Sequence, residues 1–206
     1  MKDILLSFCI PTYDRPEKLY SLVKDIISCQ NDKIEVVIGD DNPSSNRTQN
    51  IIKRFSDKRI RYFKNKKNLG EELNMLKLFK NAKGRFLYNI FDDDHVEKKA
   101  IPWLLKKISE NGNITQYCGA IGDKRPGKKG FYYEFGEGLL KRGFESIKKL
   151  LFYYGHGSGT VIKKDILDLD KAIKYCNTYT VRHYLVAQAM FAGDTLCTNE
   201  IFAYKG

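Results

Sequence analysis

Three consecutive carboxylates are the residues of this chain with the clearest capacity for chemistry. Asp92, Asp93 and Asp94 follow directly after the apolar run at 86–91. Neighbouring negative charges repel one another, and the end of a buried strand gives no folding reason to collect them. A divalent cation removes that repulsion, because a hard ion binds several oxygen ligands held close together. The run is therefore compatible with a metal site or with an acidic turn that follows a strand.

Two further polar clusters follow earlier apolar runs, one at 11–15 and one at 40–42. Ligands bind at the carboxyl ends of the strands in an open parallel sheet, so we expect both clusters to share one crevice with the three carboxylates. That crevice would supply base recognition, metal coordination and phosphate neutralisation. Asp41 can accept a hydrogen bond from the imide nitrogen of a pyrimidine. The alternative for 40–42 is an Asx-type turn.

The first hundred residues alternate between strand and helix patterns. Apolar strands are predicted at 4–10, 35–39, 59–64 and 85–91, and helices at 17–29, 46–55 and 70–82. Uninterrupted apolar strands in this order are typical of a parallel sheet that is covered on both faces. The predicted fold class is therefore α/β, with a mostly parallel central sheet flanked by helices.

The second half is less regular. Helices are predicted at 99–109, 139–154, 164–176 and 181–192, and strands at 114–121, 160–162, 195–198 and 200–204. A basic loop at 123–130 and a glycine-rich bend at 154–160 separate some of these elements. The chain has 206 residues, no internal repeat and no linker-like stretch, so we expect one domain.

The amino-acid composition limits the classes of protein to which the chain can belong. The chain is 42% hydrophobic and 30% charged, which is ordinary for a soluble globular protein. No apolar run approaches the roughly 20 residues of a membrane span. Five scattered cysteines without a CxxC pair indicate reduced thiols of a cytoplasmic protein. The net charge of +11 predicts an anionic partner, which could be nucleic acid, a membrane surface or a phosphorylated small molecule.

Four motifs, in order, resemble those of the family 2 glycosyltransferases. They are SFCIPTYDR at 7–15, VVIGDDN at 36–42, NLG at 68–70 and AKGRF at 82–86 leading into the three aspartates. Each motif alone is weak, whereas four in this order and spacing are specific. The resemblance implies a single GT-A (Rossmann-like) domain over 1–206, with a nucleotide-sugar-binding half at 1–95 and an acceptor-binding half at 96–206.

The resemblance also implies an activity and its partners. Such an enzyme moves a sugar, with inversion, from a nucleotide sugar (UDP-sugar favoured) to a cell-surface glycan or lipid-linked acceptor. A Mn²⁺ or Mg²⁺ ion held by the D-x-D element would neutralise the diphosphate leaving group. Enzymes of this kind often serve polysaccharide biosynthesis at the bacterial cell surface. We therefore expect a cytoplasmic protein that attaches peripherally to the anionic inner face of a membrane.

Position within the motifs assigns the candidate donor-site residues. The residues assigned to the donor are Pro11, Tyr13, Asp41, Asn74, Asp92 and Asp93, and the metal ligand is Asp94. Pro11 and Tyr13 would flank the nucleoside, Asp41 would meet the base, and Asp92 would lie near the ribose or diphosphate. Many relatives carry an Arg-Asn pair after the NLG motif, where this chain has the stretch 71–76. Asn74 could therefore contact the donor or lie at the surface of a helix N-terminus.

The general base is missing from its usual position. Inverting transfer needs a base within hydrogen-bond reach of the acceptor hydroxyl. Relatives usually supply an Asp or Glu at the start of the helix before the last strands, but here that position is Val181-Arg182. His183 is the nearest replacement because histidine titrates near neutrality. His156 in the glycine-rich bend is a second candidate and Asp123 a third, and each could equally have no catalytic role.

Two other functions remain open. The missing acid is compatible with a catalytically impaired, nucleotide-sugar-binding partner of another transferase. The positive charge and 13% aromatic content are compatible with a nucleic-acid-binding protein. The basic residues are dispersed and no RNA- or DNA-binding motif is present, so no nucleic-acid partner is expected. The chain could be a minimal enzyme or the catalytic domain of a longer one.

Overall fold

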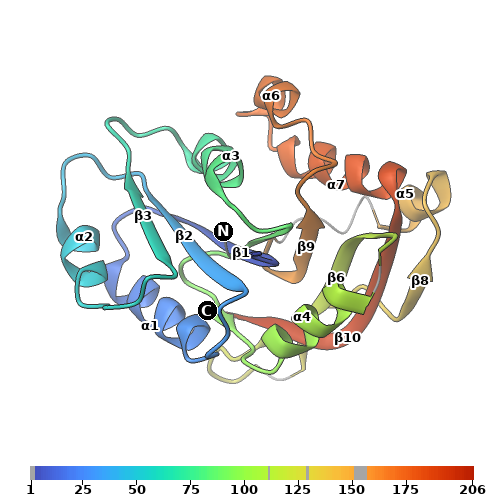
Figure 1. Ribbon diagram of the computed structural model, residues 1–206, viewed down its shortest axis with the longest axis horizontal. Helices are drawn as coiled ribbons and strands as arrows, with labels where there is room; N and C mark the ends of the chain where they lie inside the picture. The colour runs from blue at the N-terminus through green and yellow to red at the C-terminus, as the bar shows by residue number, and fades with distance from the viewer. Residues whose placement is uncertain (1–2, 111, 129, 151–156) are drawn as a thin grey trace.

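Figure 1 shows the computed structural model, which describes residues 3–110, 112–128, 130–150 and 157–206. The strands are β1 Leu6–Thr12, β2 Ile34–Asp40, β3 Ile60–Lys64, β4 Phe86–Asn89, β5 His95–Val96, β6 Ile114–Asp123, β7 Phe131–Tyr133, β8 Gly138–Leu140, β9 Thr160–Lys163 and β10 Asp194–Lys205. The α-helices are α1 Pro16–Ile27, α2 Arg47–Ile52, α3 Glu71–Asn81, α4 Ala100–Glu110, α5 Phe144–Leu150, α6 Leu169–Ala172 and α7 Val181–Ala192. Two 3₁₀ turns are η2 Gly157–Gly159 and η3 Ile173–Tyr175.

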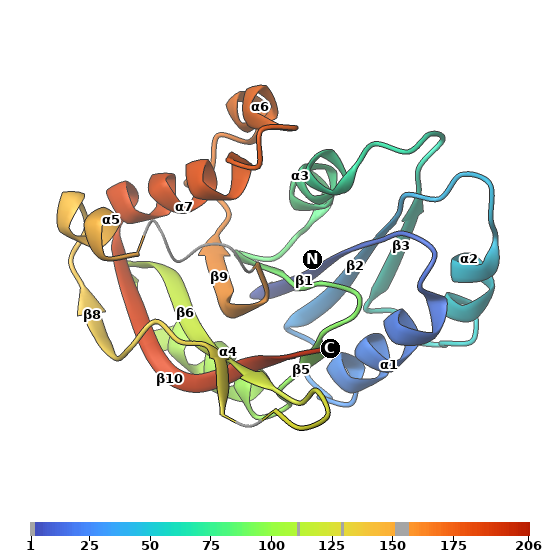
Figure 2. The same cartoon turned by 180° about the vertical axis from the view of Figure 1, so that it is seen from behind.

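One mixed sheet forms the centre of the molecule, in the order β3-β2-β1-β4-β9-β6-β10-β5. The first four of these strands are parallel, as are β6 and β10. Strand β9 is antiparallel to both of its neighbours, β4 and β6. Figure 2 shows β10 running from the region of α7 to the short strand β5. The predicted α/β class is confirmed. The four parallel strands β1–β4, whose carboxyl ends are expected to bind ligands, all come from the first half of the chain.

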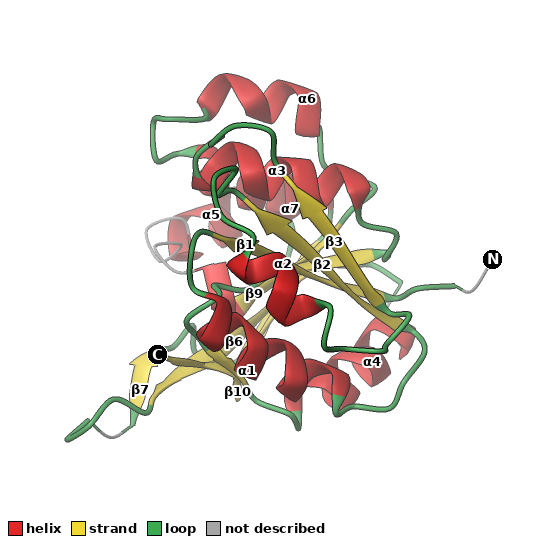
Figure 3. Cartoon of the chain, turned by 90° about the vertical axis from the view of Figure 1, so that its left-hand side faces the viewer, coloured by secondary structure: helices red, strands yellow, loops and turns green. Residues whose placement is uncertain are grey.

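Helices cover both faces of this sheet (Figure 3). Strand β1 shows why, because Phe8 and Ile10 pack into the cluster with α1 and α4, while Cys9 packs into the cluster with α3 and α7. Every side chain of β1 and β2 is buried. A strand that buries both faces needs apolar residues at consecutive positions, which is the pattern seen in the sequence.

The elements predicted in the first half are all present, with ends shifted by a few residues. The helix predicted at 139–154 is wrong over its first part. Residues 138–140 form strand β8, which pairs with β10, and helix α5 starts at Phe144. Gly138 and Gly143 have φ values of +130° and +113°, which a right-handed helix does not contain. Residues 151–154 of that prediction lie outside the described part of the chain.

Two other predictions in the second half are corrected. The helix predicted at 164–176 is reduced to α6 and η3, because the Asp168 side chain caps α6 by accepting from the Lys171 amide. The two strands predicted at 195–198 and 200–204 are one strand, β10, with register shifts beside Ile201. The helix predicted at 181–192 is confirmed as α7. Among the described helices, none is both long and apolar enough to cross a membrane.

Candidate functional site

The polar clusters that follow β1, β2 and β4 line one cavity of about 330 Å³. Tyr13, Asp41 and Asp92 each contribute to its wall, together with Pro11 and Asn74. The parallel strands explain this convergence, since their carboxyl ends meet at the same edge of the sheet. The structure thus brings together five of the residues assigned to the donor, and their ligand contacts remain predictions.

Asp41 organises one wall of this cavity. Its carboxylate accepts hydrogen bonds from Asn65 Nδ2 at 2.8 Å and from the backbone amides of Leu69 and Gly70 at 2.9 and 2.8 Å. Gly70 adopts a φ of +81°, which favours glycine, and the next residue begins α3. Because Asp41 is only 4% exposed, its first role is to fix the loop at 65–70. The predicted contact with a base would use the lone pairs that remain.

Asn74 is buried rather than on the helix surface. Its Nδ2 donates to the Gly39 carbonyl at 2.8 Å, and its Oδ1 accepts from Asn65 Nδ2 at 3.0 Å. A Cβ atom on Gly39 would lie 2.4 Å from Asn74 Oδ1, so α3 approaches β2 closely only because position 39 is glycine. The surface alternative for Asn74 is therefore excluded, while a donor contact remains a prediction.

Asp92 is held by residues of the segment that follows β1. Thr12 Oγ1 donates to Asp92 Oδ2 at 2.7 Å, and Arg15 Nη1 donates to Oδ1 at 3.0 Å. Arg15 also lies 3.2 Å from the carboxylate of Asp93, so one guanidinium neutralises two carboxylates. Burial raises the pKa of Asp92 above its ordinary value, and the bonds from Thr12 and Arg15 oppose part of that rise. Arg15 belongs to the motif at 7–15, but its position there predicted no role of its own.

Residues from the second half of the chain hold the carboxylate of Asp94. Ser158 Oγ donates to its Oδ2 at 2.7 Å, and the backbone amide of Gly206 donates to its Oδ1 at 3.1 Å. The Lys205 ammonium lies 3.4 Å from the same Oδ1. Asp94 is 1% exposed. The three consecutive carboxylates therefore already have cationic partners within the chain, namely Arg15 for the first two and Lys205 for the third.

A divalent cation at this site would have few protein ligands. In the part of the chain that the structure describes, no three His, Cys, Asp or Glu side chains gather as a possible metal site. Magnesium is usually bound by one or two carboxylates together with substrate phosphates. The Asp94 carboxylate fits that kind of site: it would hold the ion, and a diphosphate would supply further oxygens.

Two of the three residues considered as the general base, His183 and Asp123, do not line the cavity at the strand ends. His183 lies in the first turn of α7, and no hydrogen-bond partner of its buried Nδ1 is found among the described residues. The carboxylate of Asp123 is held by Arg125 at 3.0 and 2.7 Å, which lowers the pKa of Asp123 to about 2. A carboxylate so weakly basic is a poor proton acceptor near neutrality. His156 lies outside the described residues.

Arg182 lies in the first turn of α7, at the position Val181-Arg182 where the family resemblance predicts an acid. Its guanidinium forms an ion pair with Glu71 at the start of α3 and lies 5.2 Å from the centre of the Phe91 ring. Both Glu71 and Phe91 line the cavity. The unusual residues at 71–76 and at 181–182 are far apart in the sequence, and the structure joins them. Two departures from the pattern that the resemblance predicts therefore meet in one contact.

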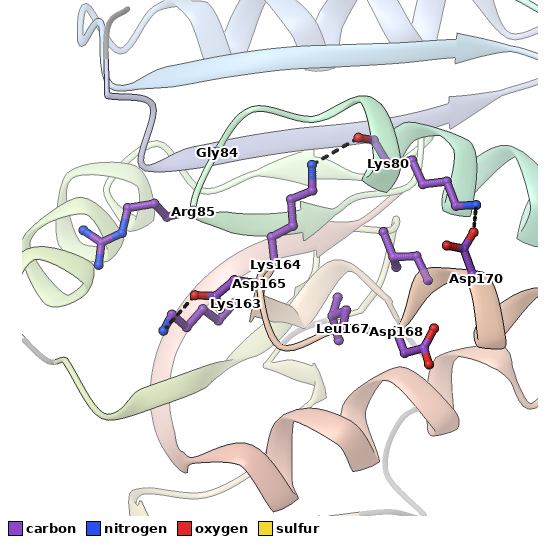
Figure 4. Close-up of a pocket in the computed structure, with 10 residues that line it drawn as sticks. Lys80, Gly84, Arg85, Lys163, Lys164, Asp165, Leu167, Asp168 and Asp170 are labelled. Carbon is purple, nitrogen blue, oxygen red and sulfur yellow. Dashed lines mark hydrogen bonds and ion pairs between the residues drawn. The ribbon is translucent and has the colours of Figure 1, made fainter.

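A larger hollow of about 640 Å³ lies at the opposite end of β4 (Figure 4). Some of its charged side chains are paired with one another, as Lys80 contacts Asp170 and Lys163 contacts Asp165. Lys164 donates to the backbone carbonyls at the end of α3. None of the residues assigned to the donor lines this hollow, so we place the candidate site at the smaller cavity.

Comparisons with known proteins identify relatives and structural neighbours of this chain. A relative from Campylobacter jejuni, GalNAc(5)-diNAcBac-PP-undecaprenol beta-1,3-glucosyltransferase, is 30% identical over 171 residues, which are 79% of this chain and 53% of that protein. The crystal structure of S. aureus TarS 1-349 superposes with a TM-score of 0.79 at 15% identity, over 98% of this chain and 60% of that one. TarS has also been solved with UDP-GlcNAc.

A second structural neighbour is the mannosyltransferase PcManGT from Pyrobaculum calidifontis, solved with GDP-Man and Mn²⁺. It superposes with a TM-score of 0.60 at 13% identity, over 100% of this chain and 57% of that one. These structures show the GT-A fold, and the chain spans about half the length of the C. jejuni relative. The model of the family described as Glycosyl transferase family 2 matches residues 7–168. The chain therefore belongs to glycosyltransferase family 2.

Proposed function

We propose that the chain catalyses transfer of a sugar from a nucleotide sugar to an acceptor hydroxyl, with inversion at the anomeric carbon. The observation that carries the proposal is the convergence of Tyr13, Asp41 and Asp92 on one cavity in a chain of this family. Tyr13 is 53% exposed there, so its ring is available to stack on a nucleoside. A UDP-sugar is the favoured donor, since an Asp41 oxygen can accept from a uracil imide.

The donor proposal is tested by titrating UDP, GDP and CMP into the protein with Mn²⁺ and, separately, with EDTA. We expect UDP to bind, and Tyr13→Ala to weaken binding by about tenfold, since stacking on a base is worth roughly 1–3 kcal/mol. Tyr132→Ala is the matched control, because Tyr132 is exposed on β7 away from the cavity. Equal UDP affinity in both variants, or no nucleotide binding by the native chain, would reject the donor site.

A divalent ion, Mn²⁺ or Mg²⁺, would meet the chain at Asp94 and neutralise the leaving diphosphate when bound. Arg15 lies beside Asp92 and is half exposed, so it can also approach the diphosphate. Ser158 orients the Asp94 carboxylate through Oδ2, and an ion held by Asp94 would compete with Lys205 and the Gly206 amide, which both contact Oδ1. These roles belong to the proposal and depend on metal-dependent nucleotide binding in the titration above.

The acceptor that we propose is a glycan or a lipid-linked sugar at the inner face of a membrane. The C. jejuni relative is named for an undecaprenol-linked substrate, and the net charge of +11 favours an anionic surface. Each basic residue near such a surface contributes about 1 kcal/mol, which suffices for weak, salt-sensitive attachment of a cytoplasmic protein. Flotation with vesicles that contain anionic lipid should recover more protein than flotation with neutral vesicles at low salt. Equal recovery would reject the membrane part.

A catalytically impaired partner protein is the second candidate. The observation that favours it is the absence of an acid at Val181-Arg182, where the family resemblance predicts one. Release of UDP from UDP-sugars by the purified chain distinguishes the candidates. An active enzyme releases UDP at a rate above that of the uncatalysed reaction, whereas an impaired partner binds UDP and releases none.

A further inference from the structure

We propose that Glu71 is the general base of the transfer reaction and that Arg182 positions its carboxylate; this inference rests on the proposed function. The starting observation is that a carboxylate of α3 contacts the first turn of α7, because Glu71 and Arg182 form an ion pair although they are 111 positions apart in the sequence. The pair places a carboxylate beside the start of α7, where the family resemblance predicts the base.

The backbone of Glu71 is fixed with respect to the cavity. The preceding residue, Gly70, donates its amide to Asp41 Oδ2 at 2.8 Å, and Asp41 also holds the Leu69 amide. Glu71 then begins α3 and lines the cavity beside Asp92. Its side chain is 52% exposed, so an acceptor hydroxyl can approach it from solvent.

The carboxylate of Glu71 is tethered through one oxygen only. Its Oε1 pairs with Arg182 Nη2, and no hydrogen bond to its Oε2 is found in the described part of the chain. Arg182 has little freedom, because its side chain is 20% exposed and its guanidinium lies over the Phe91 ring. An oriented carboxylate with one oxygen available is what proton abstraction from a hydroxyl requires.

The other carboxylates that line the cavity are already engaged. Asp41 accepts three hydrogen bonds through its two oxygens. Asp92 accepts from Thr12 with one oxygen and from Arg15 with the other. Among the cavity-lining carboxylates in the described structure, Glu71 is therefore the one with an unengaged oxygen. His183 is adjacent to Arg182 in sequence but does not line this cavity.

The step balances without a further reactant. The acceptor hydroxyl loses its proton to Glu71 Oε2, and the electron pair of that O–H bond forms the new bond to the anomeric carbon. The bond between the anomeric carbon and the phosphate oxygen breaks at the same time. The nucleoside diphosphate leaves with that electron pair, and Glu71 later returns the proton to solvent.

The test compares Glu71→Gln with Glu72→Gln in the full chain. Glu72 is the matched control because it lies in the same helical turn, and Gln keeps an oxygen to accept from the Asn177 amide. UDP release from UDP-GlcNAc, UDP-glucose and UDP-galactose is measured with water as the acceptor, alongside UDP affinity. We expect Glu71→Gln to lower the rate about 10²–10⁴-fold with UDP affinity unchanged, and Glu72→Gln to retain the native rate.

A chemical rescue separates a base from a structural residue. Glu71→Ala leaves room for a small carboxylate, so added formate should restore part of its UDP release and should not affect Glu72→Gln. Arg182→Gln should also slow release without changing UDP affinity, and Arg182→Lys should recover part of the rate. A positioning role for Arg182 predicts this split between rate and affinity, whereas collapse of the cavity would weaken both.

Three outcomes overturn the inference. One is a Glu71→Gln rate within about threefold of native, and another is a loss of rate that is matched by a loss of UDP affinity. The third is a native chain that binds UDP but releases none from any donor, because no proton transfer is then left for Glu71. A native chain that binds no UDP instead rejects the proposed function itself, so the two failures are distinguishable.

Discussion

The donor cavity and a small void beside it differ in how their buried polar groups are paired. On the donor side, Asp41, Asp92 and Asp94 have both carboxylate oxygens engaged by residues of the chain. At the void, no hydrogen-bond partner of either Asn89 amide atom or of Thr160 Oγ1 is found among the described residues. The same strand leads to both regions, because Asn89 ends β4 and the aspartates follow it.

The two regions therefore differ in how ready their polar groups are to receive a ligand. Paired carboxylates are held in place before a ligand arrives, which is the arrangement of a preorganised electrostatic site. Unpaired buried polar atoms need water or a ligand, because an unsatisfied group costs about 1–3 kcal/mol. Asn89, Thr160 and Arg182 line a void of about 30 Å³ together with apolar side chains such as Leu87 and Ile162, and this is enough room for a water molecule. The carboxylates of the donor wall are thus held by contacts within the chain, whereas the polar atoms at the void have room for water.

Asp94→Asn tests the donor side with the largest expected effect. The amide keeps the shape of the side chain but removes the charge that would bind a cation. Loss of a metal ligand exceeds the 10–100-fold cost of losing its supporting groups, so UDP affinity in Mn²⁺ should fall by about 100-fold or more. Calorimetric titration measures it, with Asp165→Asn as an exposed control that pairs with Lys163 away from the cavity. Unchanged affinity in Asp94→Asn, or in EDTA, contradicts the metal role.

Two matched threonine substitutions test the contrast itself. Thr12 and Thr160 are both buried, but only Thr12 has an identified partner, the carboxylate of Asp92 at 2.7 Å. Thr12→Val should lower the free energy of unfolding by about 1.5–3 kcal/mol, the range for a hydrogen bond to a charged group. Thr160→Val should change it by less than about 0.5 kcal/mol, because no hydrogen bond to Thr160 Oγ1 is found among the described residues. Urea unfolding measures both, and equal losses would show that bound water satisfies Thr160.

Lys205→Gln tests whether the chain's own cation competes with a metal at Asp94. The ammonium lies 3.4 Å from Asp94 Oδ1 and is 20% exposed. A partly exposed ion pair contributes up to about 1 kcal/mol, so its removal should raise the affinity for Mn²⁺ about fivefold. Electron paramagnetic resonance of free Mn²⁺ measures binding without any nucleotide. Lys163→Gln is the control, since Lys163 is 23% exposed and pairs with Asp165. A weaker or unchanged Mn²⁺ affinity in Lys205→Gln means that the lysine does not compete.

The smallest expected effect is a pH dependence from Asp92. Its pKa is raised in the folded state by burial, so the folded chain holds this proton more tightly than the unfolded chain. The free energy of unfolding should therefore fall as pH rises from about 3.8, the ordinary aspartate value, through the raised value. Asp92→Asn should lack that component when urea unfolding is repeated between pH 4 and pH 7. If the unfolding free energy of the Asp92→Asn variant changes with pH as steeply as that of the native chain, the pH dependence comes from another group.

The sequence allowed the first half of the fold to be predicted because its signals are local. Continuous apolar strands, alternating with amphipathic helices, identify a parallel sheet, and the strand-end rule then brings Tyr13, Asp41 and Asp92 to one edge. Residues 138–140 were misjudged because Leu139 and Leu140 fit a helical spacing, while pairing with β10 decides their conformation. Tertiary pairing of this kind overrides a local pattern.

The contacts that complete the site could not be predicted in the same way. Glu71 with Arg182 and Asp94 with Lys205 join residues 111 positions apart, and spacing carries no information about such pairs. The available signal was indirect: an acid was missing at one position while extra acids stood at another. An acid that is missing from one element and an additional acid on another are therefore best considered together, as one carboxylate that a different element supplies.

The three hydrogen bonds that Asp41 accepts also have a consequence for exchange kinetics. The amides of Leu69 and Gly70 belong to a surface loop, yet their acceptor is a carboxylate that is 4% exposed at the end of a central strand. Their protons can exchange with deuterium only when the loop separates from the sheet. We therefore expect these two amides to exchange as slowly as those of β2. A ligand that draws on the Asp41 carboxylate would change their exchange rates, which makes them natural reporters of nucleotide binding.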